Sequence, residues 1–228
     1  MFFRSVSCSI LTAVALSGVL TLLARQWLDL PWLALLPSIT LALAGALLLW
    51  ARFPAGVDFG WPNRVTLLRA VLLLVLLMAL WVPIDVRLAW AAALTAAVAA
   101  ALDAADGAIA RRYGQHSAFG ARFDMETDGV FVLLTALLVW HAERAGLWVV
   151  LCGLLRPALL VAMRYWPQLS RSLPPSPRRK RVAALQMVLL PLALCPLVPA
   201  PVAVLLCAVA VLSLVGSFAV DIHWLVTA

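Results

Sequence analysis

"LDAADGAIARRYGQHSAFGARFDMETDGV", residues 102–130, is a polar interval between two long apolar runs. Its acidic residues are Asp103, Asp106, Asp124, Glu126 and Asp128. The flanking runs approach the about 20 residues that a helix needs to cross a bilayer. Ionisable side chains in such runs are costly and usually have a function. The interval therefore predicts two antiparallel membrane helices, joined by a short loop, that carry a functional group of carboxylates.

The composition of the whole chain supports a membrane protein. Only 12% of its 228 residues are charged, against about 25% in a soluble domain, and the mean hydropathy is +1.06. The apolar runs are continuous and do not alternate at period two, which excludes a transmembrane barrel. We predict an all-α fold, a polytopic transmembrane helix bundle of about eight spans. These are 5–24, 31–50, 65–83, 88–110, 121–141, 146–165, 182–198 and 201–221.

Charge places the loops relative to the membrane. Most loop cations fall on one side, and the other side holds only Arg25, Arg87 and Arg144. The positive-inside rule puts the basic side and both termini in the cytoplasm, so we expect an integral protein of a bacterial inner membrane. The net charge of +7 then reflects topology and contact with lipid headgroups, and no nucleic acid partner is expected. No cleavage site is evident in residues 1–24, so the first run is expected to remain.

The acids are arranged in two pairs that mirror each other across the hairpin. Asp103 and Asp106 are three residues apart and Asp124 and Asp128 are four apart, so each pair occupies one helix face. Asp103 lies eight residues before Arg111, and Asp128 lies eight after Gly120 in the same loop region. At about 1.5 Å per residue, both carboxylates lie about 12 Å from the loop, at the same depth.

Four carboxylates this close repel one another, and partial burial increases the cost of their charge. Either some are protonated or divalent cations neutralise them. Oxygen ligands alone favour Mg²⁺, Mn²⁺ or Ca²⁺ over zinc. Two such ions a few ångströms apart would form a clamp for displacement at phosphorus.

Small residues next to the acids leave room for a ligand. Gly107, Ala110 and Gly120 suit a bulky group, although small residues in membranes also serve helix packing alone. Arg111 follows Gly107 by four residues and would lie near the same cleft as a phosphate ligand. Its alternative role is a topogenic arginine at the membrane interface.

The complete pattern resembles the signature of the CDP-alcohol phosphatidyltransferase family of integral membrane enzymes. It runs Asp103, two residues, Asp106-Gly107, two residues, Ala110-Arg111, eight residues, Gly120, three residues, Asp124, three residues, Asp128. Upstream, "PNRVTLLR" is similar to the entry of the family's first core helix through Asn63, Thr66 and Arg69. The resemblance covers residues 61–228 as a six-helix core. Residues 1–60 would be two additional N-terminal transmembrane helices.

The resemblance implies a role for each matching residue. Asp103, Asp106, Asp124 and Asp128 would bind two Mg²⁺ or Mn²⁺ ions, and Asp128 would be the catalytic base. The cytidine diphosphate would be held by a further set, namely Asn63, Thr66, Asp103, Gly107 and Arg111. The reaction expected is transfer of a phosphatidyl group from CDP-diacylglycerol to an alcohol hydroxyl, with release of CMP. Homodimerisation is a further expectation from the family.

The choice of acceptor rests on fewer residues. Arg156, Arg164 and Lys180 are candidate ligands for a phosphorylated acceptor, because they are among the remaining cations of the cytoplasmic half and such an acceptor needs cations. Arg156 lies inside a span, where an unpaired charge is expensive. "RRKRVAALQM" loosely resembles the Lys-x-x-Thr-x-x-Gln segment of the family's phosphatidylglycerophosphate and cardiolipin synthases, with Ala183 in place of threonine. Pro157 stands where those enzymes tend to have glutamate. The sequence therefore allows three kinds of acceptor: glycerol phosphate, phosphatidylglycerol or another alcohol. Lys180 is either a ligand of the acceptor or a positive-inside anchor.

Two other functions are compatible with intramembrane acids. The donor could be a small CDP-alcohol and the acceptor a lipid, which labelled substrates would distinguish. An ion-coupled transporter would place acids near the membrane midplane between inverted repeats. Here the acids lie toward one end of their helices and no internal repeat is found, which disfavours a transporter.

Overall fold

A computed structural model describes residues 6–28, 31–53, 59–113, 117–171 and 173–227, and describes side chains for all of these except 28, 34 and 105–113. Every regular element within these ranges is helical, which confirms the prediction of an all-α bundle. The helices of the first part of the chain are α1 (Val6–Leu28), η2 (Trp32–Ala34), α2 (Leu35–Arg52), α3 (Gly60–Met78), η3 (Ala79–Trp81) and α4 (Val86–Tyr113). The later ones are α5 (Ala118–His141), η4 (Leu147–Val150), α6 (Leu151–Tyr165), η5 (Pro167–Ser170), α7 (Pro177–Leu194) and α8 (Ala200–Thr227).

Six stretches among the described residues are long and apolar enough to cross a membrane. They are Val6–Trp27, Leu35–Arg52, Gly60–Trp81, Val86–Ala104, Leu147–Tyr165 and Ala200–Thr227. Of the eight predicted spans, those at α5 and α7 lack this character because the first half of each helix is charged. The beginning of α5 contains Arg122 and three acids, and α7 has four consecutive cations directly after its first residue, Pro177. The remaining apolar helices make the chain an integral membrane protein.

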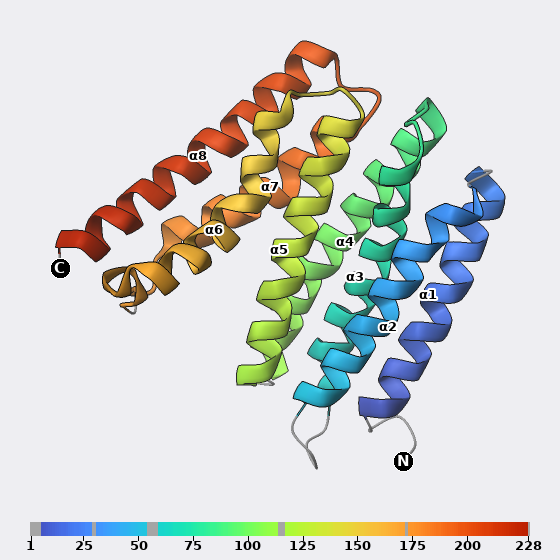
Figure 1. Cartoon of the computed structure of the whole chain (residues 1–228), viewed down its shortest axis with the longest axis horizontal. Coiled ribbons are helices and arrows are strands. Elements are labelled where there is room, and N and C mark those ends of the chain that lie inside the picture. The colour runs from blue at the N-terminus through green and yellow to red at the C-terminus, as the bar shows by residue number, and fades with distance from the viewer. Residues whose placement is uncertain (1–5, 29–30, 54–58, 114–116, 172, 228) are drawn as a thin grey trace. The chain divides into compact units, whose positions relative to one another are not determined.

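The chain divides into two compact units, Met1–Val130 and Phe131–Ala228, and the division falls inside α5. In the first unit α3 contacts α1, α2 and α4, so it is the central helix of that unit (Figure 1). In the second unit α7 and α8 form the main helix pair, and α8 also contacts α6.

Aromatic packing fixes the ends of α3 and α5 in the first unit. Phe59, fully buried just before α3, packs against Ile10 and Leu49 from α1 and α2. The ring of Phe53 lies edge-on to the rings of Phe59 and Phe119, with centroids 5.3 Å and 5.0 Å apart. Such aromatic pairs contribute about 0.5–1.5 kcal/mol each beyond the area they bury. This cluster holds the first turn of α5 beside the first turn of α3, where several candidate site residues lie.

Two predicted helix boundaries differ from the structure. The third span was expected from residue 65, but α3 begins at Gly60, whose φ of 72° is one that glycine adopts without strain. Asn63 is therefore inside the helix. The seventh span was expected from residue 182, whereas α7 begins with Pro177 in its first turn, where the missing N–H of proline costs nothing. The basic run 178–181 is consequently helical.

One arginine organises the loop between α7 and α8 in the second unit. The Arg144 guanidinium donates hydrogen bonds to the carbonyl oxygens of Ala193 and Cys195, each at 3.1 Å, and also to that of Val198. These carbonyls lie at and after the end of α7, where a helix leaves its last acceptors without internal partners. Arg144 thus satisfies backbone groups that would otherwise be costly to bury.

Gly153 permits close packing of α6 on α5, and we expect Gly153→Ala to destabilise the protein. A Cβ at this position would lie 2.6 Å from the Cβ of Leu133, and closer still to its backbone Cα. Overpacking of this kind costs about 1–3 kcal/mol. The expected result is a melting temperature lower by several degrees, measured by tryptophan fluorescence of the purified protein in detergent.

Gly216→Ala in α8 is the matched control for that variant. It adds the same methyl group to a helical glycine in the same unit, but nothing lies within 4 Å of the new Cβ. Because alanine has the higher helix propensity, Gly216→Ala should melt at or above the wild-type temperature. Equal melting temperatures for the two variants would contradict tight packing at Gly153.

Candidate functional site

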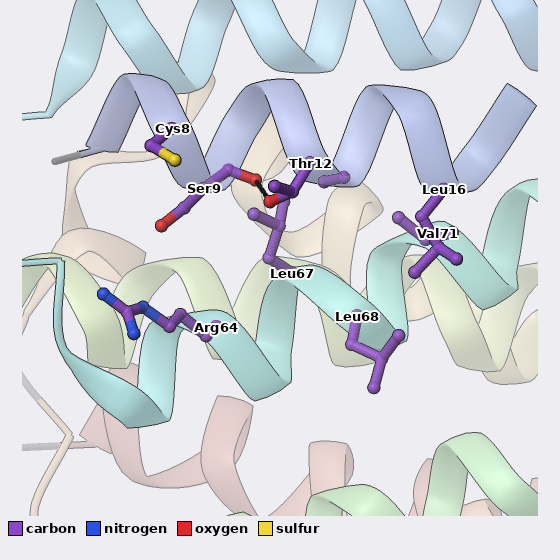
Figure 2. A pocket seen from close by; sticks show the side chains of 9 residues that line it. Cys8, Ser9, Thr12, Leu16, Arg64, Leu67, Leu68 and Val71 are labelled. Carbon is purple, nitrogen blue, oxygen red and sulfur yellow. Dashed lines mark hydrogen bonds between the residues drawn. The ribbon is translucent and has the colours of Figure 1, made fainter. Parts of the chain in front are cut away.

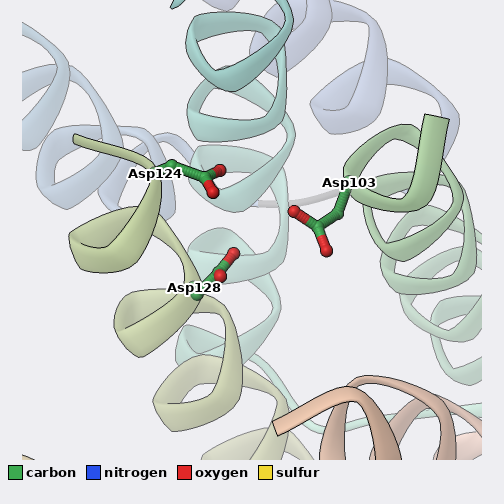
Figure 3. A group of neighbouring side chains, drawn as sticks. All are labelled: Asp103, Asp124 and Asp128. Carbon is green, nitrogen blue, oxygen red and sulfur yellow. The ribbon is translucent and has the colours of Figure 1, made fainter. Parts of the chain in front are cut away.

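Three carboxylates from two helices converge in the first unit. Asp103 comes from α4, whereas Asp124 and Asp128 stand one turn apart on α5. One oxygen of each lies within 4.8 Å of the others, and the three side chains point toward a common space (Figure 3). The i, i+4 spacing on α5 places Asp124 and Asp128 on one side of that helix. The structure therefore brings together three of the four carboxylates that the sequence assigned to metal binding.

A fourth side chain, from α3, binds all three carboxylates. The Nη1 atom of Arg69 lies 2.7 Å from Asp103 Oδ1 and 2.8 Å from Asp124 Oδ1, and Nη2 contacts Asp128 Oδ1. Arg69 was included in the sequence pattern of α3 but was given no role. The signal that could have identified it is its position: an arginine in the middle of an apolar helix requires an acidic or polar partner.

Burial differs sharply between the arginine and the acids. The Arg69 side chain is 1% exposed, while those of Asp103, Asp124 and Asp128 are 28%, 41% and 35% exposed. The guanidinium thus closes the inner side of the cluster and leaves the carboxylates accessible from the other side. With the three acids ionised, three negative charges and one positive charge give the group a net charge of −2.

The donor atoms of this cluster fit a divalent cation. Every contact to Arg69 uses the Oδ1 atom, which leaves a second oxygen on each carboxylate for another ligand. Carboxylate oxygens are the ligands that Mg²⁺ and Mn²⁺ prefer. A net charge of −2 on a partly exposed site also favours a cation. The role of these residues as metal ligands nevertheless stays a prediction.

Asn63 and Thr66 lie on the same face of α3 as Arg69, at intervals of three residues, and both are buried. Asn63 Nδ2 donates a hydrogen bond of 2.6 Å to the Phe59 carbonyl, and the Thr66 hydroxyl donates one of 3.2 Å to that of Pro62. These bonds to the preceding turn fix the rotamers of both side chains. The predicted nucleotide ligands Asn63 and Thr66 are thus within two turns of the carboxylate cluster.

Gly120 allows α5 to approach Asn63. A Cβ at position 120 would lie only 2.6 Å from Asn63 Oδ1 and 2.9 Å from Ser117 Oγ. A larger residue would have to displace the side chains of Asn63 and Ser117. Gly120 therefore serves helix packing, which is one of the two roles that the sequence suggested for the small residues.

Several predicted site residues cannot be placed in the same way. Asp106, Gly107 and Arg111 belong to α4, but their side chains lie outside the described part of the chain. The candidate acceptor ligands belong to the second unit. Arg156 on α6 is half-buried, whereas Arg164 on α6 and Lys180 on α7 are exposed.

An ion pair that the sequence did not reveal engages part of the basic run 178–181 of α7. Asp221 on α8 is 7% exposed and accepts hydrogen bonds from Arg178 and, at 3.2 Å, from Arg179. The Nε atom of Arg178 also donates to Ser217 Oγ at 3.2 Å. Two of the four cations are thus engaged in joining α7 to α8, while Lys180 and Arg181 are exposed.

A groove between α1 and α3 lies in the same unit as the carboxylates. Its volume is about 160 Å³, and Figure 2 shows Arg64 at one end and apolar side chains along its length. The lining includes Leu16, Leu67 and Val71. No described acid lines it, so this groove is chemically distinct from the cluster around Arg69.

Comparisons with known proteins agree on one family. The model of the CDP-alcohol phosphatidyltransferase family matches residues 59–216, more than half of the chain. The chain is also 33% identical over 113 residues to proteins named CDP-diacylglycerol–glycerol-3-phosphate 3-phosphatidyltransferase from Escherichia coli (strain K12), Shigella boydii serotype 4 (strain Sb227) and Shigella sonnei (strain Ss046). Each match covers 48% of this chain and 61% of the relative. The chain thus spans less than two thirds of the length of these relatives.

Proposed function

The chain belongs to the CDP-alcohol phosphatidyltransferase family, and from this we propose that it transfers a phosphatidyl group from CDP-diacylglycerol to a hydroxyl of glycerol 3-phosphate, releasing CMP. The observation that carries the proposal is the convergence of Asp103, Asp124 and Asp128 in an integral membrane protein. The name of the relatives supports both substrates. A site in an integral membrane protein suits a donor that has acyl chains and a polar head.

The proposed reaction is a displacement at the phosphorus that bears the diacylglycerol. The acceptor oxygen forms a new bond to this phosphorus, and the bond to the oxygen shared with CMP breaks. The electron pair of that bond leaves with CMP, and the proton of the acceptor hydroxyl passes to a carboxylate. We assign this base to Asp128, which is partly exposed and lies about one turn deeper along α5 than Asp124.

The remaining residues around the carboxylates would hold the substrate. Asp103, Asp106, Asp124 and Asp128 would bind two divalent ions, Mg²⁺ or Mn²⁺, which when bound neutralise the pyrophosphate and the leaving group. The cytidine diphosphate would contact the face of α3 that carries Asn63 and Thr66, together with Asp103, Gly107 and Arg111 on α4. Fixed rotamers at Asn63 and Thr66 would orient the nucleotide before reaction, which lowers the entropy cost of alignment.

For the acceptor we propose Arg156, Arg164 and Lys180 as ligands of the glycerol phosphate. Arg178 and Arg179 are less available because both contact Asp221. Lys180 lies near the beginning of α7 and is exposed, so its ammonium group is accessible to a ligand. Two residues, Ala183 on α7 and Pro157 on α6, depart from the pattern of the family's phosphatidylglycerophosphate and cardiolipin synthases.

The domain division and the location are part of the same proposal. We place the catalytic core at residues 61–228 and treat residues 1–60 as two additional helices, a division supported by a family match that begins at residue 59. The positive-inside bias supports insertion in a bacterial inner membrane with the site facing the cytoplasm. A homodimer is proposed by analogy with the family.

The substrate assignment is tested with purified full-length protein in detergent. It is incubated with CDP-diacylglycerol, Mg²⁺ or Mn²⁺ and one of several acceptors: glycerol 3-phosphate, phosphatidylglycerol, inositol or serine. We expect CMP and phosphatidylglycerophosphate only with glycerol 3-phosphate. Product with another acceptor would correct the acceptor and retain the reaction type. CMP release only from a small CDP-alcohol with diacylglycerol would instead reverse donor and acceptor.

A further inference from the structure

We propose that Arg69 is a resident counter-cation: it holds the three carboxylates together in the metal-free protein and gives up part of this function when a divalent ion binds. Arg69 is a positioning residue, since its contacts are to Asp103, Asp124 and Asp128. The part of this inference that concerns metal rests on the proposed function. The part that concerns the metal-free protein rests on the ion pairs alone.

Arg69 is the described cation that forms ion pairs with all three carboxylates of the cluster. Its Nη1 atom bridges α4 and α5 by contacting Asp103 and Asp124, and Nη2 reaches Asp128 one turn farther along α5. One planar guanidinium thus joins three helices, α3, α4 and α5. A lysine ammonium is a point charge on a flexible stem and lacks this fork of donors.

Burial makes the pairing of Arg69 with the three acids obligatory when no other cation is bound. An arginine that is 1% exposed cannot be neutralised by solvent, so its charge depends on the acids around it. The acids depend on Arg69 in turn, because without it three carboxylates would share one site with no positive charge from the described side chains. Like charges at this spacing repel strongly when water is partly excluded.

A divalent ion can take over the same electrostatic role from the exposed side. Two cations that neutralise one cluster are thermodynamically linked, and each lowers the benefit of the other. Metal should therefore stabilise a variant without the Arg69 charge more than it stabilises the wild-type chain. A residue needed only to fill space would show no such dependence on metal.

The test is the melting temperature of the full chain in detergent, followed by the fluorescence of its 10 tryptophans, first in chelator and then in Mn²⁺. Arg69→Met keeps the apolar stem but removes the charge. In chelator we expect it to melt about 10 °C below wild type, because removing one partner of a buried ion pair is strongly destabilising. Saturating Mn²⁺ should recover at least half of this loss. Arg69→Lys, which keeps the charge but not the fork, should fall between the two.

A double variant tests the metal-free part independently. Asp128→Asn removes a partner of Arg69 in the wild-type background, but in Arg69→Met it removes one of three mutually repelling charges. We expect Asp128→Asn to raise the melting temperature of Arg69→Met in chelator, and to lower or leave unchanged that of wild type. If Arg69→Met cannot be recovered folded, recovery of the double variant supports the inference equally, and failure of both overturns it.

The remaining outcomes separate this inference from the proposed function. A loss of stability in Arg69→Met that Mn²⁺ does not recover, although Mn²⁺ stabilises wild type, would reduce Arg69 to a packing role. Wild-type stability of Arg69→Met in chelator would also overturn the inference. If Mn²⁺ stabilises no variant, the metal-dependent function fails, while the effect of Asp128→Asn on the melting temperature of Arg69→Met in chelator still decides whether Arg69 is the counter-cation.

Discussion

Asp128→Asn is expected to lower CMP release by about 10²–10⁴-fold while the chain still folds and inserts into the membrane. The amide has the size of the carboxylate but cannot accept the proton of the acceptor hydroxyl. It can still accept a hydrogen bond from Arg69, so the contact between α3 and α5 is retained in part. The measurement is CMP release by purified protein from CDP-diacylglycerol and glycerol 3-phosphate, with substrate concentration varied to separate kcat from KM. A loss confined to kcat is expected.

Glu126→Gln is the matched control for the proposed base. Glu126 lies two residues from Asp128 on the same helix, is exposed and stands outside the sequence signature. The two variants remove the same charge from α5, so a general change in the potential of the site would affect both. We expect Glu126→Gln to retain nearly all activity. Full activity in Asp128→Asn would remove Asp128 as the base, and equal losses in both variants would point to a general charge effect.

The convergence of the carboxylates could be anticipated because it depends on local geometry. Helical periodicity puts Asp124 and Asp128 on one face, and a loop of a few residues forces α4 and α5 to be antiparallel neighbours. Equal depth follows from the rise per residue alone. None of these steps requires knowledge of how distant helices pack.

Ion pairs between distant helices could not be anticipated in the same way. Arg69 meets acids 55 and 59 residues away, and this depends on the rotation of α3, which packing around Phe59 and Phe119 helps to fix. Asp221 similarly meets Arg178 from a separate helix. An isolated charge in an apolar run indicates that a partner exists, but the identity of that partner depends on tertiary packing.

Helix ends were the least predictable local feature. Hydropathy placed the third span at residue 65, because the preceding turn contains Pro62, Asn63 and Arg64, which are not apolar. The structure extends α3 to Gly60, where the positive φ of glycine lets the chain enter the helix. The backbone freedom of one residue, which hydropathy does not measure, thus decided whether Asn63 lies in a loop or on the helix.

Removal of divalent cations is expected to abolish CMP release, and addition of Mg²⁺ or Mn²⁺ to restore it. The acids of the cluster exceed its one arginine by two charges, and the pyrophosphate of the donor brings further negative charge into the same space. Without cations this repulsion opposes substrate binding and the charge on departing CMP is unbalanced. The measurement is activity in chelator, followed by titration with each metal. Activity that persists in excess chelator would contradict a metal-dependent reaction.

The same charge balance predicts how the metal ions bind. One divalent ion is enough to neutralise the net charge of −2 on Asp103, Asp124, Asp128 and Arg69, so the first ion should bind without nucleotide. A second ion would make the described group positive unless further acids or phosphates were present, so its binding should strengthen when a cytidine diphosphate compound is added. Calorimetric titration with Mn²⁺, with and without CDP-glycerol, measures both steps. Asp124→Asn should weaken binding of the first ion, because it leaves only one net negative charge to attract that ion. Binding of two ions with equal affinity to the wild-type protein without nucleotide would contradict this account of the site's charge.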